Sequence, residues 1–205
     1  MKIVIIGAGT SAINTADIII HDRNFKLVGF VGTEEDEKKY NNINVYNNLP
    51  FLGSFNILKE LVDDGVVGFI AAIGKRYIRE KRFYEASMSG LTPINAISRS
   101  AVIEPSAIIG KGVTIGSGCI ISHGVSIGDN TCLDSGVIVE IKTEIGENCN
   151  LSSGVIIGGL CNIGRNVSIG SRSTISHHAI VGKNNYILAG QVIEKGLADK
   201  IRDEK

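Results

Sequence analysis

The sequence predicts two domains: an α/β Rossmann-like domain, followed by an all-β parallel β-helix. Two observations predict this fold class. Strand and helix patterns alternate up to about residue 95, which is typical of a parallel sheet covered by helices. From Ile103 to Ile193, a branched aliphatic residue then occupies every sixth position without a miss. A period of six fits neither a helix nor an isolated strand, and hexapeptide repeats form parallel β-helices.

The first domain, residues 1–95, is expected to hold three strands and three helices. Its hydrophobic runs place strands at 2–7, 25–32 and 66–73. Its helical patterns fall at about 10–21, 54–64 and 76–89. The segment 33–50 is rich in Glu, Lys and Asn and is interpreted as a polar loop.

The second domain, residues 96–193, is expected to be a prism of about five coils, each with three short strands. The repeated aliphatic residue should point inward and stack on its equivalent about 4.8 Å away in the next coil. Glycine follows that residue in eight hexads, where we expect it to allow unusual backbone angles at the corners. Residues 194–205 are expected to form a charged tail.

Composition excludes several function classes. The 21 basic and 21 acidic residues balance, so no basic surface for nucleic acid is expected. No apolar run approaches the roughly 20 residues that span a membrane. The chain opens on a strand with no leader pattern, so we expect a cytoplasmic protein. The four cysteines contain no CxxC spacing and are interpreted as structural thiols, with no metal site.

A GxGxxA turn, residues 7–12, joins the first strand to the first helix. Glycines at such a turn let a phosphate approach the backbone N–H groups of the helix N-terminus. The alternative is a bare structural turn. An NAD site would need an acid at the end of the second strand, but Gly32 stands there. A nucleotide or nucleotide-sugar is therefore the favoured ligand.

The third strand ends at Gly74, and Arg79 follows in the next helix. Ligands of open α/β sheets bind at the carboxyl ends of the strands, so this strand end should border the same crevice. Arg79 either meets a phosphate there or lies on a solvated helix face. The candidate substrate-binding residues are Gly7, Gly9, Thr10, Ser11, Gly74 and Arg79.

The period of six also assigns residues to the faces and corners of the prism. His123 and His177 each follow a repeat aliphatic residue by two positions, and the spacing between them is three whole coils. They are therefore expected to share one column with Ile141 and Gly159, and His178 should lie beside it. Histidine is the commonest general base near neutral pH.

Three segments together resemble one family: the opening IIGAGTSA, the strand ending AAIG, and the hexads that begin SAVIEPSAIIGKGVTIG. They are similar to the bacterial nucleotide-sugar N-acetyltransferases grouped with sialic acid O-acetyltransferases, including enzymes of the UDP-bacillosamine pathway. The likeness covers about residues 2–193. It implies a left-handed β-helix, a homotrimer, acetyl-CoA as co-substrate between neighbouring β-helices, a nucleotide-sugar on the first domain, and a role in surface glycan biosynthesis.

The resemblance also implies that a histidine, oriented by an acid, takes a proton from the sugar amine or hydroxyl as it attacks the thioester. That histidine and acid align with Ile141-Lys142, which cannot do this. His123 lies one coil away on the same face, so we expect His123 to be the base and Glu140 to orient it. The alternative for His123 is a solvent-facing residue without chemistry.

The remaining positions of the family pattern depart in part from this chain. A sugar-contacting histidine of the turn corresponds to Ser11, and a second histidine of the β-helix corresponds to Asn150. The expected CoA contacts by resemblance are Asn150, Gly159, Ser171 and Ala189. Two function classes stay open. One is an acetyl-CoA-dependent sugar acyltransferase, and the other is a non-catalytic relative that binds a nucleotide or sugar or assembles with an active paralogue.

Overall fold

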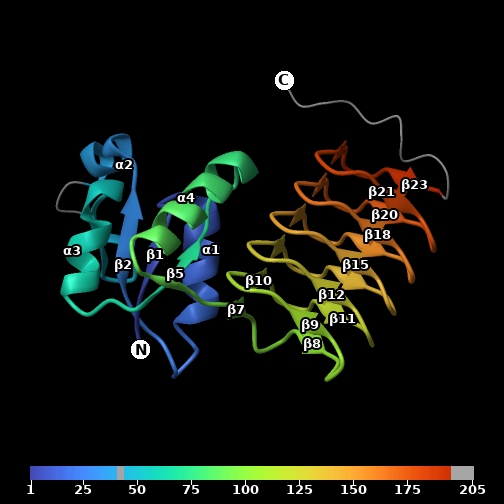
Figure 1. Ribbon diagram of the computed structural model, residues 1–205, viewed down its shortest axis with the longest axis horizontal. Coiled ribbons are helices and arrows are strands. Elements are labelled where there is room, and N and C mark those ends of the chain that lie inside the picture. Colours follow the sequence, from blue (N-terminus) through green and yellow to red (C-terminus); the bar gives the residue numbers. More distant parts are fainter. Residues whose placement is uncertain (41–43, 195–205) are drawn as a thin grey trace. The chain divides into compact units, whose positions relative to one another are not determined.

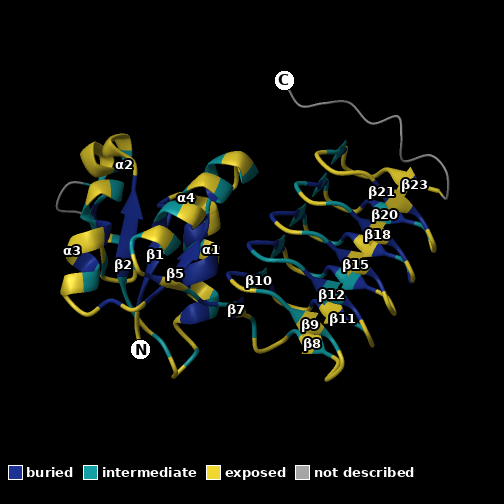
Figure 2. Cartoon of the chain, viewed as in Figure 1, coloured by how far each residue is buried: buried dark blue, intermediate teal, exposed yellow. Residues whose placement is uncertain are grey.

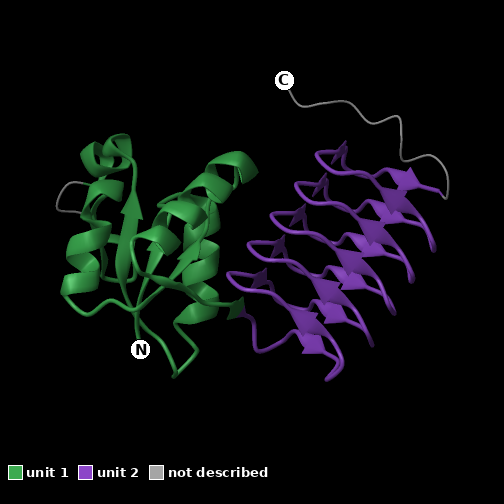
Figure 3. Ribbon diagram, in the orientation of Figure 1, with its two compact units in different colours: residues 1–96 green, residues 97–205 purple. Residues whose placement is uncertain are grey.

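A computed structural model of the chain describes residues 1–40 and 44–194. The chain divides into two compact units, with the boundary between Ala96 and Ile97 (Figure 3). Unit 1 is an α/β domain, and unit 2 is a left-handed parallel β-helix, as the sequence predicts. The charged tail predicted for 194–205 lies, beyond Glu194, outside the described residues.

Unit 1 is built on one six-stranded sheet in the order β3-β4-β2-β1-β5-β6 (Figure 1). Only the β3–β4 pair is antiparallel within this sheet. The strands are β1 (Lys2–Ile6), β2 (Lys26–Gly32), β3 (Asn44–Tyr46), β4 (Leu49–Ser54), β5 (Gly68–Ala71) and β6 (Thr92–Pro93).

Helices cover both faces of this sheet, because side chains along β1 alternate between two cores. Ile3 and Ile5 pack with α1 (Thr10–Ile19), whereas Val4 and Ile6 pack with residues of α3 and α4. The helices of the second face are α3 (Leu58–Asp63), which follows the 3₁₀ turn η1 (Phe55–Ile57), and α4 (Arg76–Met88). The predicted strands and helices are confirmed, with ends that move by a few residues.

The prediction of a polar loop at 33–50 is wrong. This segment contains α2 (Glu34–Lys39), β3 and the start of β4. A reciprocal capping box stabilises the short helix: the Thr33 hydroxyl accepts from the Asp36 N–H at 3.1 Å, and the Asp36 carboxylate accepts from the Thr33 N–H at 2.9 Å. β4 pairs parallel with β2, so partners far away in the sequence decide its conformation.

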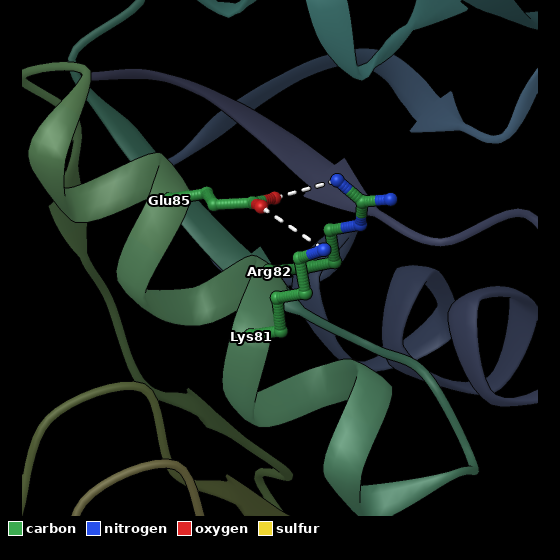
Figure 4. A network of polar contacts seen from close by, with 3 residues as sticks. All are labelled: Lys81, Arg82 and Glu85. Carbon is green, nitrogen blue, oxygen red and sulfur yellow. Dashed lines mark hydrogen bonds and ion pairs between the residues drawn. The ribbon is translucent and has the colours of Figure 1, made fainter.

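A network of polar side chains lies on α4, formed by Lys81, Arg82 and Glu85 (Figure 4). The Arg82 guanidinium carbon lies 3.7 Å from the centroid of the Phe55 ring, a cation–π contact. Its Nη1 donates to the Glu85 carboxylate at 2.5 Å, and the Lys81 ammonium lies 3.8 Å from the same carboxylate. One arginine therefore links the helix to η1.

Unit 2 is a three-sided prism, and each strand stacks in register on the equivalent strand of the next coil. Face 1 consists of β7 (Ala96–Ile97), β10 (Thr114–Ile115), β13 (Cys132–Leu133), β16 (Asn150–Leu151), β19 (Ser168–Ile169) and β22 (Tyr186–Ile187). Face 2 consists of β8 (Val102–Ile103), β11 (Ile120–Ile121), β14 (Ile138–Val139), β17 (Ile156–Ile157), β20 (Thr174–Ile175) and β23 (Val192–Ile193). Face 3 consists of β9 (Ile108–Ile109), β12 (Ser126–Ile127), β15 (Glu144–Ile145), β18 (Asn162–Ile163) and β21 (Ile180–Val181).

The repeated aliphatic residues make up the buried core of unit 2, as predicted. Buried and exposed stretches alternate along its coils (Figure 2). From Ile115 to Ile187 each of them is buried, and only Ile103 and Ile109 in the first coil are half-buried. Three cysteines, Cys119, Cys149 and Cys161, belong to the same core. Burial raises the pKa of the Cys119 and Cys161 thiols, which disfavours their charged form.

The physical reason expected for the repeat glycines is wrong. The glycine directly after the aliphatic residue does not have a positive φ; the left-handed position comes two residues later, at Gly112, Asn130 and their equivalents. Glycine is needed for space instead. A Cβ on Gly128 would lie 2.6 Å from Glu147 N, and one on Gly146 would lie 2.6 Å from Arg165 N. At these two glycines the backbone of the next coil leaves no room for a Cβ.

The left-handed position between faces 3 and 1 holds four stacked asparagines. Asn130, Asn148, Asn166 and Asn184 have φ values of 55°, 56°, 58° and 63°. The amide nitrogens of the first three each donate to the amide oxygen of the asparagine in the next coil, at 2.9, 2.8 and 3.1 Å in turn. Asparagine suits this position because it tolerates left-handed backbone angles and its amide can bond to an identical neighbour.

Candidate functional site

The glycine-rich turn of unit 1 brings three strand ends together. Gly7 has a φ of +124°, and a Cβ on it would lie 2.4 Å from the carbonyl oxygen of Ala72. Its N–H donates to the Val31 carbonyl at 2.7 Å. Glycine is therefore required at position 7 by both backbone angle and space, which supports a tight turn at the carboxyl ends of β1, β2 and β5.

The first helix begins directly after this turn. Its N-cap is Gly9, so no side chain caps the N-terminus, and Gly9, Thr10 and Ser11 are exposed. A Cβ on Gly9 would meet nothing within 4 Å. An uncapped N-terminus offers backbone N–H groups and the positive end of the helix dipole, which together attract an anion.

The end of β5 borders the same place, as predicted. A Cβ on Gly74 would lie 3.4 Å from the hydroxyl oxygen of Ser11. Arg79, by contrast, is 1% exposed, and its Nη1 donates to the Ile73 carbonyl at 3.3 Å. The alternative of a solvated helix face for Arg79 is therefore wrong. The positive charge of Arg79 lies beneath the end of β5. A direct contact between Arg79 and a ligand stays a prediction.

The sequence patterns do not identify Tyr40 and Asp36 as residues near the site, because both fall in the segment interpreted as a loop. The Tyr40 hydroxyl donates to the Ala8 carbonyl at 3.0 Å, so this side chain reaches the glycine-rich turn. A Cβ on Gly32 would lie 2.7 Å from an Asp36 carboxylate oxygen. The capping acid of α2 thus takes the space at the end of β2 that a side chain at position 32 would need.

In unit 2, the predicted histidine column lies in the corner between faces 2 and 3, here named corner 2–3. Backbone hydrogen bonds connect each coil to the next at this corner. The Lys142 N–H donates to the His123 carbonyl at 2.9 Å, and the His178 N–H donates to the Gly159 carbonyl at 3.0 Å. His123, Ile141, Gly159 and His177 are therefore stacked as the period of six predicts.

The expected contact between Glu140 and His123 is not formed among the described residues. The Nδ1 atom of His123 lies 2.7 Å from the Ser106 hydroxyl oxygen, which also accepts the Gly124 N–H at 3.0 Å. Glu140 instead extends to the following coil, where its Oε2 accepts the Gly159 N–H at 3.2 Å.

The four expected CoA contacts do not lie together in one chain. Ser171 and Ala189 are exposed and stacked one coil apart in the corner between faces 1 and 2, where the Gly190 N–H donates to the Ser171 carbonyl at 2.9 Å. Asn150 begins β16 on face 1. Gly159 lies in corner 2–3, on the other side of face 2. Of these four residues, only Ser171 and Ala189 are neighbours within one chain.

The described residues offer neither a cluster of metal ligands nor a membrane-spanning helix. Within residues 1–40 and 44–194, no three His, Cys, Asp or Glu side chains gather closely enough to hold a metal ion. In the same ranges, every helix is too short or too polar to cross a lipid bilayer.

Known families and structures match both units. Residues 2–86 match the family model of the PglD N-terminal domain, and residues 106–140 match that of the hexapeptide repeat of succinyl-transferase. The acetyltransferase domain of PglB from Neisseria gonorrhoeae aligns with a TM-score of 0.85 at 22% identity, covering 97% of this chain and 93% of that one. The chain has the fold of this acetyltransferase domain.

Further similarities support this resemblance. A histidine-to-asparagine variant of perosamine N-acetyltransferase from Caulobacter crescentus, solved with CoA and GDP-perosamine, aligns with a TM-score of 0.63 at 22% identity, covering 100% of this chain and 98% of that one. The PglB domain bound to acetyl coenzyme A aligns with a TM-score of 0.67 at 24% identity, covering 95% and 93%. No curated protein sequence matches the chain. The resemblance to nucleotide-sugar N-acetyltransferases is confirmed by these matches.

Proposed function

We propose that this protein is an acyltransferase that transfers an acetyl group from acetyl-CoA to an amino or hydroxyl group of a nucleotide-activated sugar, in surface glycan biosynthesis. The observation that carries the proposal is the pairing of the two units. An α/β domain that matches the PglD N-terminal domain precedes a hexapeptide β-helix, and solved sugar acetyltransferases share this arrangement over nearly their whole length.

In this proposal unit 1 binds the nucleotide-sugar. The diphosphate lies at the N-terminus of α1, where Gly9 leaves space and the backbone N–H groups supply hydrogen bonds. The hydroxyls of Thr10 and Ser11 and the exposed Gly74 border the same place. Arg79 contributes its buried positive charge behind the strand end.

The proposed reaction is a direct attack on the thioester. A histidine of corner 2–3 takes a proton from the sugar nucleophile, the acetyl carbon forms its new bond, and the thiolate of CoA leaves. The sequence predicts His123 as this base. Its contact with Ser106 supports that role, because an Nδ1–H donated to the hydroxyl leaves Nε2 as the basic nitrogen. His177 is the other histidine of the column that could take the proton.

The co-substrate is proposed to contact the β-helix at Asn150, Gly159, Ser171 and Ala189. Since these residues lie on different sides of face 2 in one chain, contacts with all four require surfaces from more than one protomer. This separation supports the homotrimer that the resemblance implies. A cytoplasmic location, where acetyl-CoA and nucleotide-sugars are available, is part of the same proposal.

The outer surface of face 2 offers an interface for a second copy of the chain. Its outward positions are apolar in all coils but one: Val102 is 56% exposed, Ile120 42%, Ile156 38% and Val192 63%, with Ile138 half-buried between them. An apolar stripe along a whole prism is typical of an interaction surface, and an identical prism beside it would match it coil by coil.

Light scattering tests this assembly. We expect a particle of about three times the 21.8 kDa chain mass, and a smaller particle for Ile156→Asp, which places a charge in the stripe. The matched control is Asn162→Asp on face 3, which adds the same charge outside the stripe. A monomeric wild-type protein would overturn the trimer but leave the transfer reaction to be judged by its own assay.

Release of free CoA thiol, measured with UDP- and GDP-linked amino sugars and acetyl-CoA, tests the reaction. Gly9→Ala is the informative variant, because the added methyl group meets nothing within 4 Å and the φ of −91° suits alanine. We expect unchanged folding, a KM for the nucleotide-sugar raised about tenfold, and an unchanged KM for acetyl-CoA. Absence of thiol release with every sugar would overturn the proposed reaction.

The second candidate function is a non-catalytic binding protein. The observation that favours it is Ile141, which stands, 45% exposed, where the resemblance places the base. Thermal unfolding separates the two functions. A ligand at 100 times its dissociation constant stabilises a protein by about 2.7 kcal/mol, so acetyl-CoA should raise the melting temperature of an acyltransferase. Stabilisation by nucleotide-sugars but not by acetyl-CoA would favour the binding protein.

A further inference from the structure

The carboxylate of Asp36 lies at the carboxyl end of β2. Gly32 is the last residue of that strand, and a Cβ on it would lie 2.7 Å from Asp36 Oδ2 and 3.0 Å from Asp36 Cβ. The carboxylate therefore takes the place in which a side chain at position 32 would begin. The acid that the sequence lacks at the end of β2 is thus supplied by the helix that follows the strand.

The capping box of α2 explains why this acid points back toward the strand. Thr33 is the N-cap of the helix, and Asp36 is its third residue. In a capping box, the side chain of the third residue folds back to the N–H of the N-cap. Because the N-cap here directly follows β2, the folded-back carboxylate lies at the strand end.

One oxygen of this carboxylate stays available to a ligand. Oδ2 accepts both the Thr33 N–H at 2.9 Å and the Thr33 hydroxyl at 2.8 Å. Within residues 1–40 and 44–194, no hydrogen bond engages Oδ1. Asp36 is half-buried, so water and ligands can reach it. An ionised carboxylate only accepts hydrogen bonds, so its partner must bring a hydroxyl or an N–H.

Hydrogen bonds and a ring contact hold this acid beside the glycine-rich turn. The Tyr40 hydroxyl, at the end of α2, donates to the Ala8 carbonyl at 3.0 Å. The Tyr40 ring stacks on that of Phe51, with 6.0 Å between centroids. The Gly7 N–H donates to the Val31 carbonyl at 2.7 Å. Both α2 and the end of β2 are therefore tied to the turn that precedes α1.

We propose that Asp36 recognises the ribose of the nucleotide-sugar, by accepting a hydrogen bond from its 2′-hydroxyl on Oδ1. The inference rests on the proposed function, and it names the substrate class of that site as ribonucleotide sugars rather than 2′-deoxyribonucleotide sugars. In α/β nucleotide sites, phosphates lie at the N-terminus of the first helix, and an acid near the end of the second strand accepts from the ribose. Here the acid comes from α2 instead of the strand.

The two sugars differ in what they offer to this oxygen. A bond from a hydroxyl to a carboxylate is charge-assisted and stronger than a bond between neutral groups. A 2′-deoxyribose has no hydroxyl at this position, so Oδ1 would lose water without gaining a donor. Because Asp36 is half-buried rather than enclosed, we expect a preference of about tenfold, far below that of a closed site.

Calorimetric titration of the whole protein with UDP and dUDP tests the inference, because these nucleotides differ only in the 2′-hydroxyl. The wild type should bind UDP about tenfold more tightly, and GDP over dGDP by the same ratio. Asp36→Asn should lower the ratio to about two, because asparagine keeps an oxygen for the Thr33 cap but loses the charge. Gly32→Ala should lower it as well, because its Cβ displaces the carboxylate without removing the charge.

Two further variants separate the ribose contact from other effects. Glu37→Gln removes an exposed acid from the first turn of the same helix and should leave the ratio unchanged. Gly9→Ala should weaken UDP and dUDP by the same factor, because both nucleotides carry the same diphosphate. Circular dichroism of each variant checks that the fold is kept.

The outcomes distinguish this inference from the function on which it rests. Equal affinities of the wild type for UDP and dUDP, and for GDP and dGDP, overturn the inference, while the acyl transfer is judged by thiol release. A preference that persists in folded Asp36→Asn and Gly32→Ala belongs to another residue and overturns the role of Asp36. Absence of binding by all four nucleotides overturns the proposed function of unit 1 and the inference together.

Discussion

The asparagine ladder of unit 2 yields a prediction whose magnitude follows from the structure. Asn148 occupies the middle of the ladder, is 2% exposed, and joins Asn130 and Asn166 through bonds of 2.9 and 2.8 Å. Each such bond contributes about 1 kcal/mol net to the free energy of unfolding. Asn148→Gly keeps the left-handed backbone and removes both bonds. We therefore expect this variant to lower the free energy of unfolding by about 2 kcal/mol, the sum of the two bonds.

Two companion variants divide this loss into its parts. Asn148→Ala removes the same bonds and keeps a Cβ at a φ of 56° without the short polar side chain by which asparagine tolerates this conformation. Relative to Asn148→Gly this adds about 1 kcal/mol, for a total of about 3 kcal/mol. Asn184→Gly removes one exposed bond at the end of the ladder and should cost only about 0.5 kcal/mol. The gradient from the middle of the prism to its end is thus part of the prediction.

Urea unfolding followed by circular dichroism measures these differences. All variants are compared at one protein concentration, because assembly makes the apparent stability depend on concentration. Equal stabilities of Asn148→Gly and wild type would refute the contribution of the ladder. Equal stabilities of Asn148→Gly and Asn148→Ala would refute the argument from left-handed strain, and either result would be independent of any catalytic role.

Three further predictions concern other parts of the chain. Gly7→Ala should destabilise unit 1 by about 3 kcal/mol in urea unfolding, because its Cβ would lie 2.4 Å from the Ala72 carbonyl oxygen at a φ of +124°. Arg82→Ala should lower the free energy of unfolding by about 1 kcal/mol through loss of its contacts with Phe55 and the neighbouring acid, and Arg82→Lys should restore only part of this. Burial raises the pKa of the Cys119 thiol, so its contribution to stability is complete below the ordinary value of 9.0 and is lost as pH rises through the folded value. Unfolding midpoints measured from pH 7 to 11 should fall above about pH 9, and a flat profile would contradict this.

Much of the fold could be predicted because its patterns are periodic. The period of six alone assigned His123, Ile141, Gly159 and His177 to one corner column, and the backbone bonds confirm that assignment. The glycine-rich turn likewise predicted the meeting of β1 and β5 with α1. The segment 33–50 could not be predicted in this way, because a capping box and pairing with β2 decide its structure rather than any long hydrophobic period.

The candidate site likewise contains features that the sequence predicts and features that only the structure decides. The sequence alone determined which residues share a face or a corner, because every coil has the same length and each strand stacks on its equivalent in the next coil. Only the tertiary structure decided which side chains of neighbouring coils touch. Glu140 could extend toward His123 below or toward Gly159 above, and its Oε2 accepts the Gly159 N–H at 3.2 Å. Register along a solenoid follows from the repeat, whereas the direction of each side chain depends on the volumes of the residues one coil away.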